Sequence, residues 1–188
     1  YNSSENRAIT VGLHLINTFT LLFFAAGSFY FAHSPAQRFR FSWQKDRGFF
    51  IIFFLLALVG ASGAITALGD TLFPIKEGAH AFADISPSAH LFVRLRIYHP
   101  ILALAVSSSL LYFISRFFTS VETLRRTAFW IVFVTLTQIA CGFLNIYLHA
   151  PNLLQLMHLF LADIVWILVV ILFFQGRSLS GRAAPLSF

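Results

Sequence analysis

Five long apolar runs, separated by shorter polar or charged stretches, dominate the hydrophobic pattern of this chain. A helix needs about 20 apolar residues to cross the hydrocarbon core of a bilayer, and each run comes close to or exceeds that length. We therefore predict an all-α fold, a polytopic membrane helical bundle with five transmembrane helices. The predicted spans are Ala8–Ala32, Phe49–Gly69, Ile97–Phe118, Phe129–His149 and Leu153–Phe174.

Composition and charge agree with a membrane location and argue against nucleic acid as a ligand. Of the 188 residues, 58% are hydrophobic and 11% are charged, whereas about a quarter of the residues of a soluble domain are charged. The net charge of +6 arises from basic residues that gather on one side of the predicted spans, the side that the positive-inside rule makes cytoplasmic. That side holds Arg38, Arg40, Lys45, Arg47, Arg116, Arg125, Arg126, Arg177 and Arg182, and the other holds Arg7, Lys76, Arg94 and Arg96.

Polar side chains inside the last two runs indicate where function resides. Polar groups at membrane depth are costly and normally face a bundle interior or a site. In the fifth run, His158 and Asp163 interrupt an otherwise apolar sequence, and Asp163 either bonds a polar group on a neighbouring helix or is protonated. In the fourth run, four residues at helical spacing form one polar stripe, namely Gln138, Gly142, Asn145 and His149. The single cysteine, Cys141, fits a buried apolar position.

Three histidines stand near the outward ends of their spans. We expect His14, His99 and His158 to lie within roughly 10 Å of that end, at 1.5 Å of rise per residue. His99 and His158 are each followed four residues later by alanine, which leaves room for the edge of a macrocycle, and both imidazoles lean outward. The pair is typical of haem ligation by two histidines, whereas a zinc site would need a third and fourth ligand nearby. The alternative is that each histidine is an ordinary hydrogen-bonded residue of the bundle.

The residues around the predicted start of span three leave further alternatives open. Arg94 and Arg96 are well placed for anionic groups such as haem propionates, or they anchor the span at the membrane interface. Pro100 suits the first turn of a helix. The small residues between Gly60 and Gly69 allow either close helix packing or the approach of a flat ligand.

Three sequence strings resemble the carboxy-terminal half of the haem A synthases. They are GASGAITALGDTLFP, LRIYHPILA and QIACGFLNIYLHAPNLLQLMHL. The family resembles a tandem of two four-helix bundles, so residues 1–47 would be the last helix of an amino-terminal bundle with its cytoplasmic loop. Residues 48–188 would form the complete second bundle, which binds haem. The resemblance leads us to expect further spans before Tyr1.

The resemblance implies an oxidoreductase acting on a CH or CH2 group, which converts the C8 methyl of haem O to the formyl of haem A with water as the oxygen source. It implies that His99 and His158 ligate the iron of haem b, and that His14 belongs to the catalytic site for the substrate haem. It also places four residues at the cofactor, namely Arg94, Arg96, Gln138 and Asn145. The implied partners are a haem O synthase or the assembly of cytochrome oxidase, and an oligomer is compatible with them. The implied location is the prokaryotic plasma membrane or the mitochondrial inner membrane.

Two departures from the family pattern bear on the role of this stretch. The glutamate-x-x-histidine motif of the first bundle has no copy here, because Arg96 stands three residues before His99. We therefore expect the second bundle to transfer electrons rather than oxidise the substrate. The cysteine pair of many members is absent from residues 70–96. Two alternatives stay open: a cytochrome b-type electron-transfer subunit without haem-modifying activity, and a haem-free membrane scaffold subunit.

Overall fold

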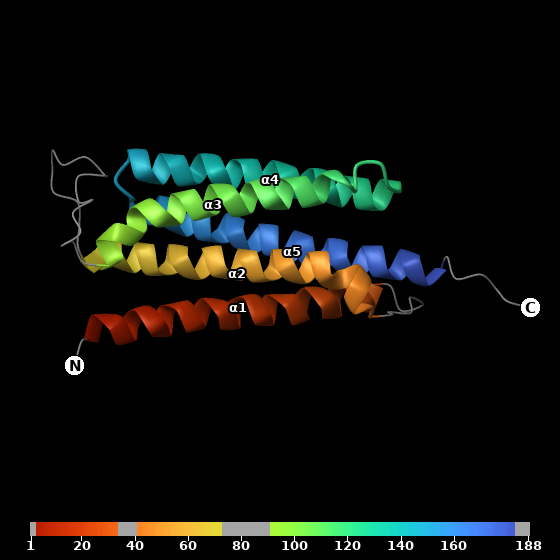
Figure 1. The fold of residues 1–188 in the computed structure, drawn as a ribbon, viewed down its shortest axis with the longest axis horizontal. Helices are drawn as coiled ribbons and strands as arrows, with labels where there is room; N and C mark the ends of the chain where they lie inside the picture. Colours follow the sequence, from red (N-terminus) through yellow and green to blue (C-terminus); the bar gives the residue numbers. More distant parts are fainter. Residues whose placement is uncertain (1–2, 34–40, 73–90, 183–188) are drawn as a thin grey trace, which may run out of the picture.

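The computed structural model describes residues 3–33, 41–72 and 91–182, which form five helices and, within these ranges, no strand (Figure 1). Each helix is long and apolar enough to cross a membrane. The prediction of an all-α bundle with five spans is therefore confirmed, and the chain is an integral membrane protein. The helices are α1 (Ser3–His33), α2 (Trp43–Leu72), α3 (Leu91–Ser115), α4 (Glu122–Tyr147) and α5 (Asn152–Arg182).

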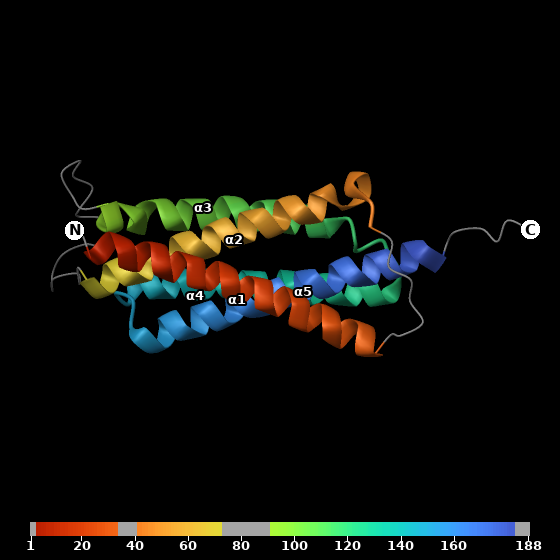
Figure 2. The same ribbon diagram turned by 90° about the horizontal axis from the view of Figure 1, so that it is seen from below.

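Consecutive helices run antiparallel, and α2 to α5 form a four-helix bundle (Figure 1). The closest helix pairs are α2 with α3 and α4 with α5, while α1 packs along the outside against α2 and α5 (Figure 2). We call the end with the start of α1 and the α4–α5 turn the outer end, after the predicted topology, and the opposite end the inner end. The basic residues predicted on the inner side, where the structure describes their side chains, all belong to helix ends or turns there: Lys45, Arg47, Arg116, Arg125, Arg126 and Arg177.

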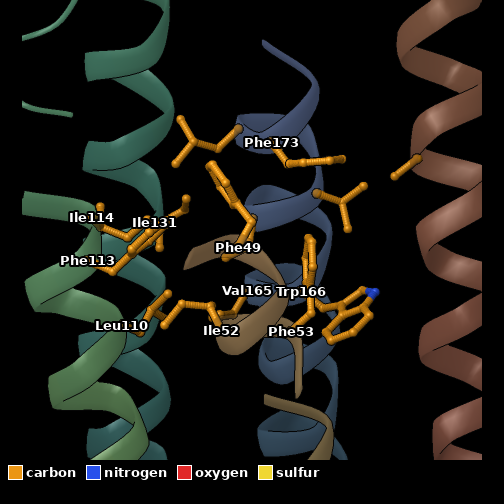
Figure 3. Packing of buried hydrophobic residues seen from close by; sticks show 14 of the residues in the cluster. Phe49, Ile52, Phe53, Leu110, Phe113, Ile114, Ile131, Val165, Trp166 and Phe173 are labelled. Carbon is orange, nitrogen blue, oxygen red and sulfur yellow. The ribbon is translucent and has the colours of Figure 1, made fainter. Parts of the chain in front are cut away.

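A tightly packed apolar core occupies the inner half of the bundle. Phe19 of α1 stacks on Trp166 of α5 at 4.5 Å between ring centroids, and Phe49 of α2 meets Phe113 and Phe173 edge to face. Figure 3 shows the rings of Phe49, Phe113, Trp166 and Phe173 beside branched aliphatic side chains from α3, α4 and α5. The fully buried members include Leu110, Ile114, Ile131, Val169, Val170 and Leu172.

Burial decreases toward the outer end. Among the described side chains, α5 has no buried residue before Val165 and α3 has none before Val106. In α4 the last buried hydrophobic residue is Cys141, and the one before it is Val134. In the outer half of α3, α4 and α5 most described side chains are thus partly buried or exposed, whereas α1 and α2 keep buried residues there, among them Ala8 and Thr66.

A buried ion pair joins α2 and α5 at the inner end. The sequence placed Arg177 in a cytoplasmic loop beyond span five, but α5 continues to Arg182, and Arg177 pairs inside the protein with Asp46. The Arg177 side chain is 10% exposed and Asp46 is fully buried. The backbone N–H of Ser42 donates to Asp46 Oδ2 at 2.8 Å, and one residue after Arg177 the hydroxyl of Ser178 bonds Tyr30 of α1 at 3.1 Å. This polar layer ties three helices together.

The ends of α3 differ from the predicted span. The helix ends at Ser115 rather than at Phe118, and it begins at Leu91, so Pro100 lies in its interior and not in its first turn. Proline has no N–H to donate to the carbonyl four residues earlier, which here belongs to Arg96. The backbone next to His99 therefore lacks one helical hydrogen bond.

The predicted polar stripe on α4 is shorter than expected. The helix ends at Tyr147, and His149 and Ala150 both adopt a φ of 58° in the turn that leads to α5. This left-handed conformation is costly for residues with a Cβ atom. His149 consequently leaves the helix face that Gln138, Gly142 and Asn145 share.

Candidate functional site

His99 lies on α3 about 12 Å from the start of that helix, at 1.5 Å per residue, and it packs against α2. Its Nδ1 atom is 2.9 Å from the hydroxyl oxygen of Ser62. The next residue on α2 is Gly63, and a Cβ atom at that position would lie 2.8 Å from Cε1 of the His99 ring. Because such a distance is too short for a carbon contact, only glycine lets the imidazole rest against the α2 backbone as it does here.

His158 occupies the equivalent place on α5 and packs against α4. It lies about 9 Å from the start of its helix, and the Gln138 side-chain amide nitrogen stands 3.3 Å from its Nε2 atom. A Cβ atom at Gly142 would lie 3.1 Å from the Cε1 atom of His158. Asn145 donates from Nδ2 to the carbonyl of Leu154 at 3.4 Å. These three members of the polar stripe therefore share one face of α4, as the spacing predicts, and the structure turns that face toward α5.

The two histidines form a matched arrangement across the bundle. Each imidazole lies over a glycine of the preceding helix. Three buried polar atoms around His158 have no hydrogen-bond partner among the described residues: Gln138 Oε1, Asn145 Oδ1 and His158 Nδ1. Such atoms are rare in native proteins and each costs about 1–3 kcal/mol. Their concentration beside a half-buried histidine is typical of a site that receives a polar or metal-bearing ligand.

The donor set distinguishes between a metal ion held by the protein alone and a haem. The described residues contain no group of three or more histidine, cysteine, aspartate or glutamate side chains that could hold a metal ion. Two imidazoles suffice for haem, because the macrocycle supplies the remaining ligands of the iron. The paired histidines therefore fit a haem better than a zinc ion.

The two arginines before His99 differ in their surroundings. Arg96 is 11% exposed and its Nε atom lies 2.5 Å from Oδ1 of Asp70, in the last turns of α2. A second guanidinium nitrogen lies 3.4 Å from the carbonyl of Gly69. Neither of the predicted roles included an acidic partner, and Asp70 was expected in the loop that follows span two. Arg94 is partly exposed.

The structure does not bring His14 to the other two histidines. His14 is exposed on α1, whereas the following residue, Leu15, points inward and would contact a Cβ at Gly60 of α2 at 2.9 Å. At about 16 Å from the start of α1, His14 lies farther from its helix end than His99 and His158 do. The Nδ1 atom of His33 donates to the carbonyl oxygen of Phe29 at 2.9 Å on the exposed surface.

Two further predictions concern Asp163 and the histidines at positions 80 and 90, which the sequence places in the loop after span two. Asp163 Oδ1 is buried without a hydrogen-bond partner, so the structure gives this oxygen no polar group on a neighbouring helix. His80 and His90 lie outside the described residues.

Sequence reasoning missed Ser62 and Gly63 as neighbours of His99. Both belong to the segment of small residues between Gly60 and Gly69 on α2. The sequence left two roles open for that segment, close helix packing and the approach of a flat ligand. The structure divides the segment: Gly60 allows close packing of α1, and Gly63 accommodates the imidazole. The signal was present in the sequence, but which small residue faces which helix depends on rotation and register between helices.

Comparison with known proteins gives one family and two curated relatives. A family model described as cytochrome oxidase assembly protein matches residues 2–170. The relatives come from two strains of Thermus thermophilus, are both named protoheme IX farnesyltransferase, and are 37% and 36% identical over 177 residues. The match covers 91% of this chain but only 29% of each relative, so the chain spans less than a third of their length. No solved structure matches significantly.

Proposed function

Because this chain belongs to the family of cytochrome oxidase assembly proteins, which includes the haem A synthases, we propose that it acts in the conversion of haem O to haem A. In this proposal the four-helix bundle within residues 48–188 holds a b-type haem that carries electrons. The observation that supports this role most directly is the pair His99 and His158, each lodged over a glycine of a neighbouring helix.

The residues of the site have separate tasks in this proposal. His99 and His158 provide one imidazole each to the iron, and the haem supplies reversible one-electron transfer when it is bound. Gly63 and Gly142 let the two rings rest against the backbones of α2 and α4. Gln138 and Asn145 present buried oxygen atoms that have no protein partner and can accept hydrogen bonds from a ligand or water.

Charge at the outer end supports an anionic ligand beside His99. Arg96 is neutralised in part by Asp70 at 2.5 Å, while Arg94 is only partly buried two residues before it. A guanidinium at a membrane interface binds carboxylates well. Arg94 is therefore the better candidate for a haem propionate, and Arg96 keeps the outer ends of α2 and α3 together.

The oxidation itself is assigned to a second site that includes His14. Its imidazole is exposed on the face of α1 that does not pack against the bundle, as a residue of an adjacent haem site on an amino-terminal bundle would be. A haem held by residues 48–188 would supply one-electron transfer for this oxidation. The relatives named for farnesyl transfer to protohaem contain a segment similar to this chain, which supports a haem O synthase as a partner and a prokaryotic plasma membrane as the location.

A cytochrome b-type electron-transfer subunit is the second candidate. It is favoured by Arg96, which stands where the oxidising site of the family has glutamate, and by the ligand pair that either function would use. The two candidates differ in one product. Only the enzyme forms haem A when its full-length protein is supplied with haem O in membranes.

The experiment measures haem in the purified protein and haem A in the membranes that produced it. We expect a low-spin b-type spectrum that His99→Ala and His158→Ala each abolish or convert to high-spin, while His33→Ala, a control on the exposed surface, leaves it unchanged. Extracted membranes should contain haem A with the unsubstituted protein and with His33→Ala, but not with either ligand variant. If both ligand variants kept the low-spin spectrum, the haem assignment would be wrong. A normal spectrum without haem A would favour the electron-transfer subunit.

A further inference from the structure

We propose that Ser62 is a positioning residue that fixes the tautomer of His99, so that Nδ1 carries the proton and Nε2 is left as the atom that binds iron. The tautomer follows from the hydrogen bonds around Ser62. The consequence for iron rests on the proposed function.

The hydroxyl of Ser62 has one proton and two neighbours. Its oxygen is 2.8 Å from the carbonyl oxygen of Val59 and 2.9 Å from Nδ1 of His99. A carbonyl oxygen can only accept, and two oxygens 2.8 Å apart without a proton between them would repel. The hydroxyl therefore donates to Val59, and its lone pair accepts from His99. This requires an N–H at Nδ1.

A neutral imidazole carries one proton, so the Nε2 atom of His99 holds a free lone pair. Within the described part of the chain, Nε2 has no hydrogen-bond partner. Gly63 provides the space, because without a Cβ atom at this position the edge of the ring can rest against α2, with Nδ1 beside the Ser62 hydroxyl. Adjacent residues thus supply the hydrogen bond and the space.

His158 is held differently. The Gln138 amide nitrogen, which can only donate, faces its Nε2 atom at 3.3 Å, while its Nδ1 atom is buried without a partner. Of the two imidazoles, only that of His99 has its tautomer set by a group that leaves Nε2 free. His99 is therefore prepared for a metal, and His158 must first exchange its bond to Gln138.

Donation from Nδ1–H to an acceptor raises the basicity of the opposite nitrogen and orients the ring, and loss of such a partner typically weakens metal binding 10–100-fold. We expect Ser62→Ala to weaken the binding of ferric protohaem by about this factor. A more basic imidazole also favours ferric over ferrous iron, so the midpoint potential should rise in Ser62→Ala. Each tenfold decrease in the ratio of ferric to ferrous affinity raises the midpoint potential by about 59 mV for a one-electron couple.

The test compares Ser62→Ala with two other variants. Ser62→Thr keeps a hydroxyl at the same place and should restore binding and potential. Ser109→Ala is the matched control, because Ser109 also bonds a backbone carbonyl of its own helix, at 2.8 Å, but is exposed. Three quantities are measured: the affinity for ferric protohaem, the midpoint potential of the bound haem, and the 15N NMR shifts of the His99 ring in haem-free protein.

The outcomes separate this inference from the proposed function. If the His99 ring is protonated at Nδ1 in the unsubstituted protein and in Ser109→Ala, but not in Ser62→Ala, the tautomer assignment is supported whether or not haem binds. If no variant binds haem, the proposed function is overturned and the tautomer assignment is not. If the protein binds haem and Ser62→Ala matches it in affinity, potential and ring protonation, the role of Ser62 is wrong while the haem site stands.

Discussion

The buried ion pair between Asp46 and Arg177 allows a sharp test of how the inner end is held together. Asp46 has no exposed surface and the Arg177 side chain is 10% exposed, so removing one partner strands a charge that water cannot reach. Loss of one partner of a buried pair typically costs about 3–5 kcal/mol. We expect Asp46→Asn and Arg177→Met each to reduce the free energy of unfolding by that amount.

The double variant should behave quite differently. With Asn at position 46 and Met at position 177 no buried charge remains, and replacement of a whole buried pair is often neutral or stabilising by about 1–4 kcal/mol. The two single losses should therefore not add. A coupling energy of several kcal/mol, larger than the usual 0.5–3 kcal/mol for residues in contact, would reflect how completely the pair is shielded.

The assay is unfolding of the protein in detergent micelles, followed by far-ultraviolet circular dichroism. Glu122 and Arg125 provide the control pair, since their side chains are 72% and 55% exposed at the same end of the bundle. Exposed pairs contribute about 0–1 kcal/mol, so Glu122→Gln should change little. If Asp46→Asn were no more harmful than Glu122→Gln, the buried pair would not lock α2 to α5, and the reasoning would be refuted.

Three further predictions concern other parts of the chain. Cysteines placed at Lys45 and Arg7 should react with an impermeant reagent from opposite sides of the membrane, and labelling from the same side would contradict the topology. Asp163→Leu removes a buried oxygen without a partner and should raise the melting temperature in detergent, whereas Asp163→Asn should not; a lower melting temperature for the leucine variant would reveal a partner. Gly63→Ala should displace the imidazole it faces and reduce haem binding, while Gly176→Ala, where a Cβ meets nothing within 4 Å, should leave haem binding intact.

The sequence predicts the number and the approximate place of the helices because both follow from a local property. A run of about 20 apolar residues has to be a spanning helix in lipid, where all backbone groups must be satisfied within the segment. The ends of the helices are less predictable. Hydropathy reports where the bilayer begins, and the hydrogen-bonded helix continues beyond it, which is why α3 starts before His99 and encloses Pro100.

The partners across helices could not be predicted from the sequence. Spacing alone showed that Gln138 and Gly142 share a face, and the structure turns that face toward His158. The meeting of Ser62 with His99 depends instead on the relative rotation and height of two helices. The pairing of Arg177 with Asp46 depends on helix rotation and height in the same way. Its charge alone indicates a helix end, and does not show whether the side chain is in water or buried against an aspartate.

The unequal packing of the two halves explains how the bundle tolerates its polar site. Three unpartnered buried atoms at about 1–3 kcal/mol each are a large cost beside the 5–15 kcal/mol that stabilises a typical protein, and in lipid the hydrophobic effect does not drive helices together. Helix positions must then be fixed by close contact, and in the inner half this comes from interlocked rings such as Phe19 on Trp166 and from the Asp46–Arg177 pair. Because each helix is rigid over its length, contacts that hold it at the inner end also set its position at the outer end. The outer half can consequently keep unpartnered amide oxygens and two imidazoles that rest against glycines.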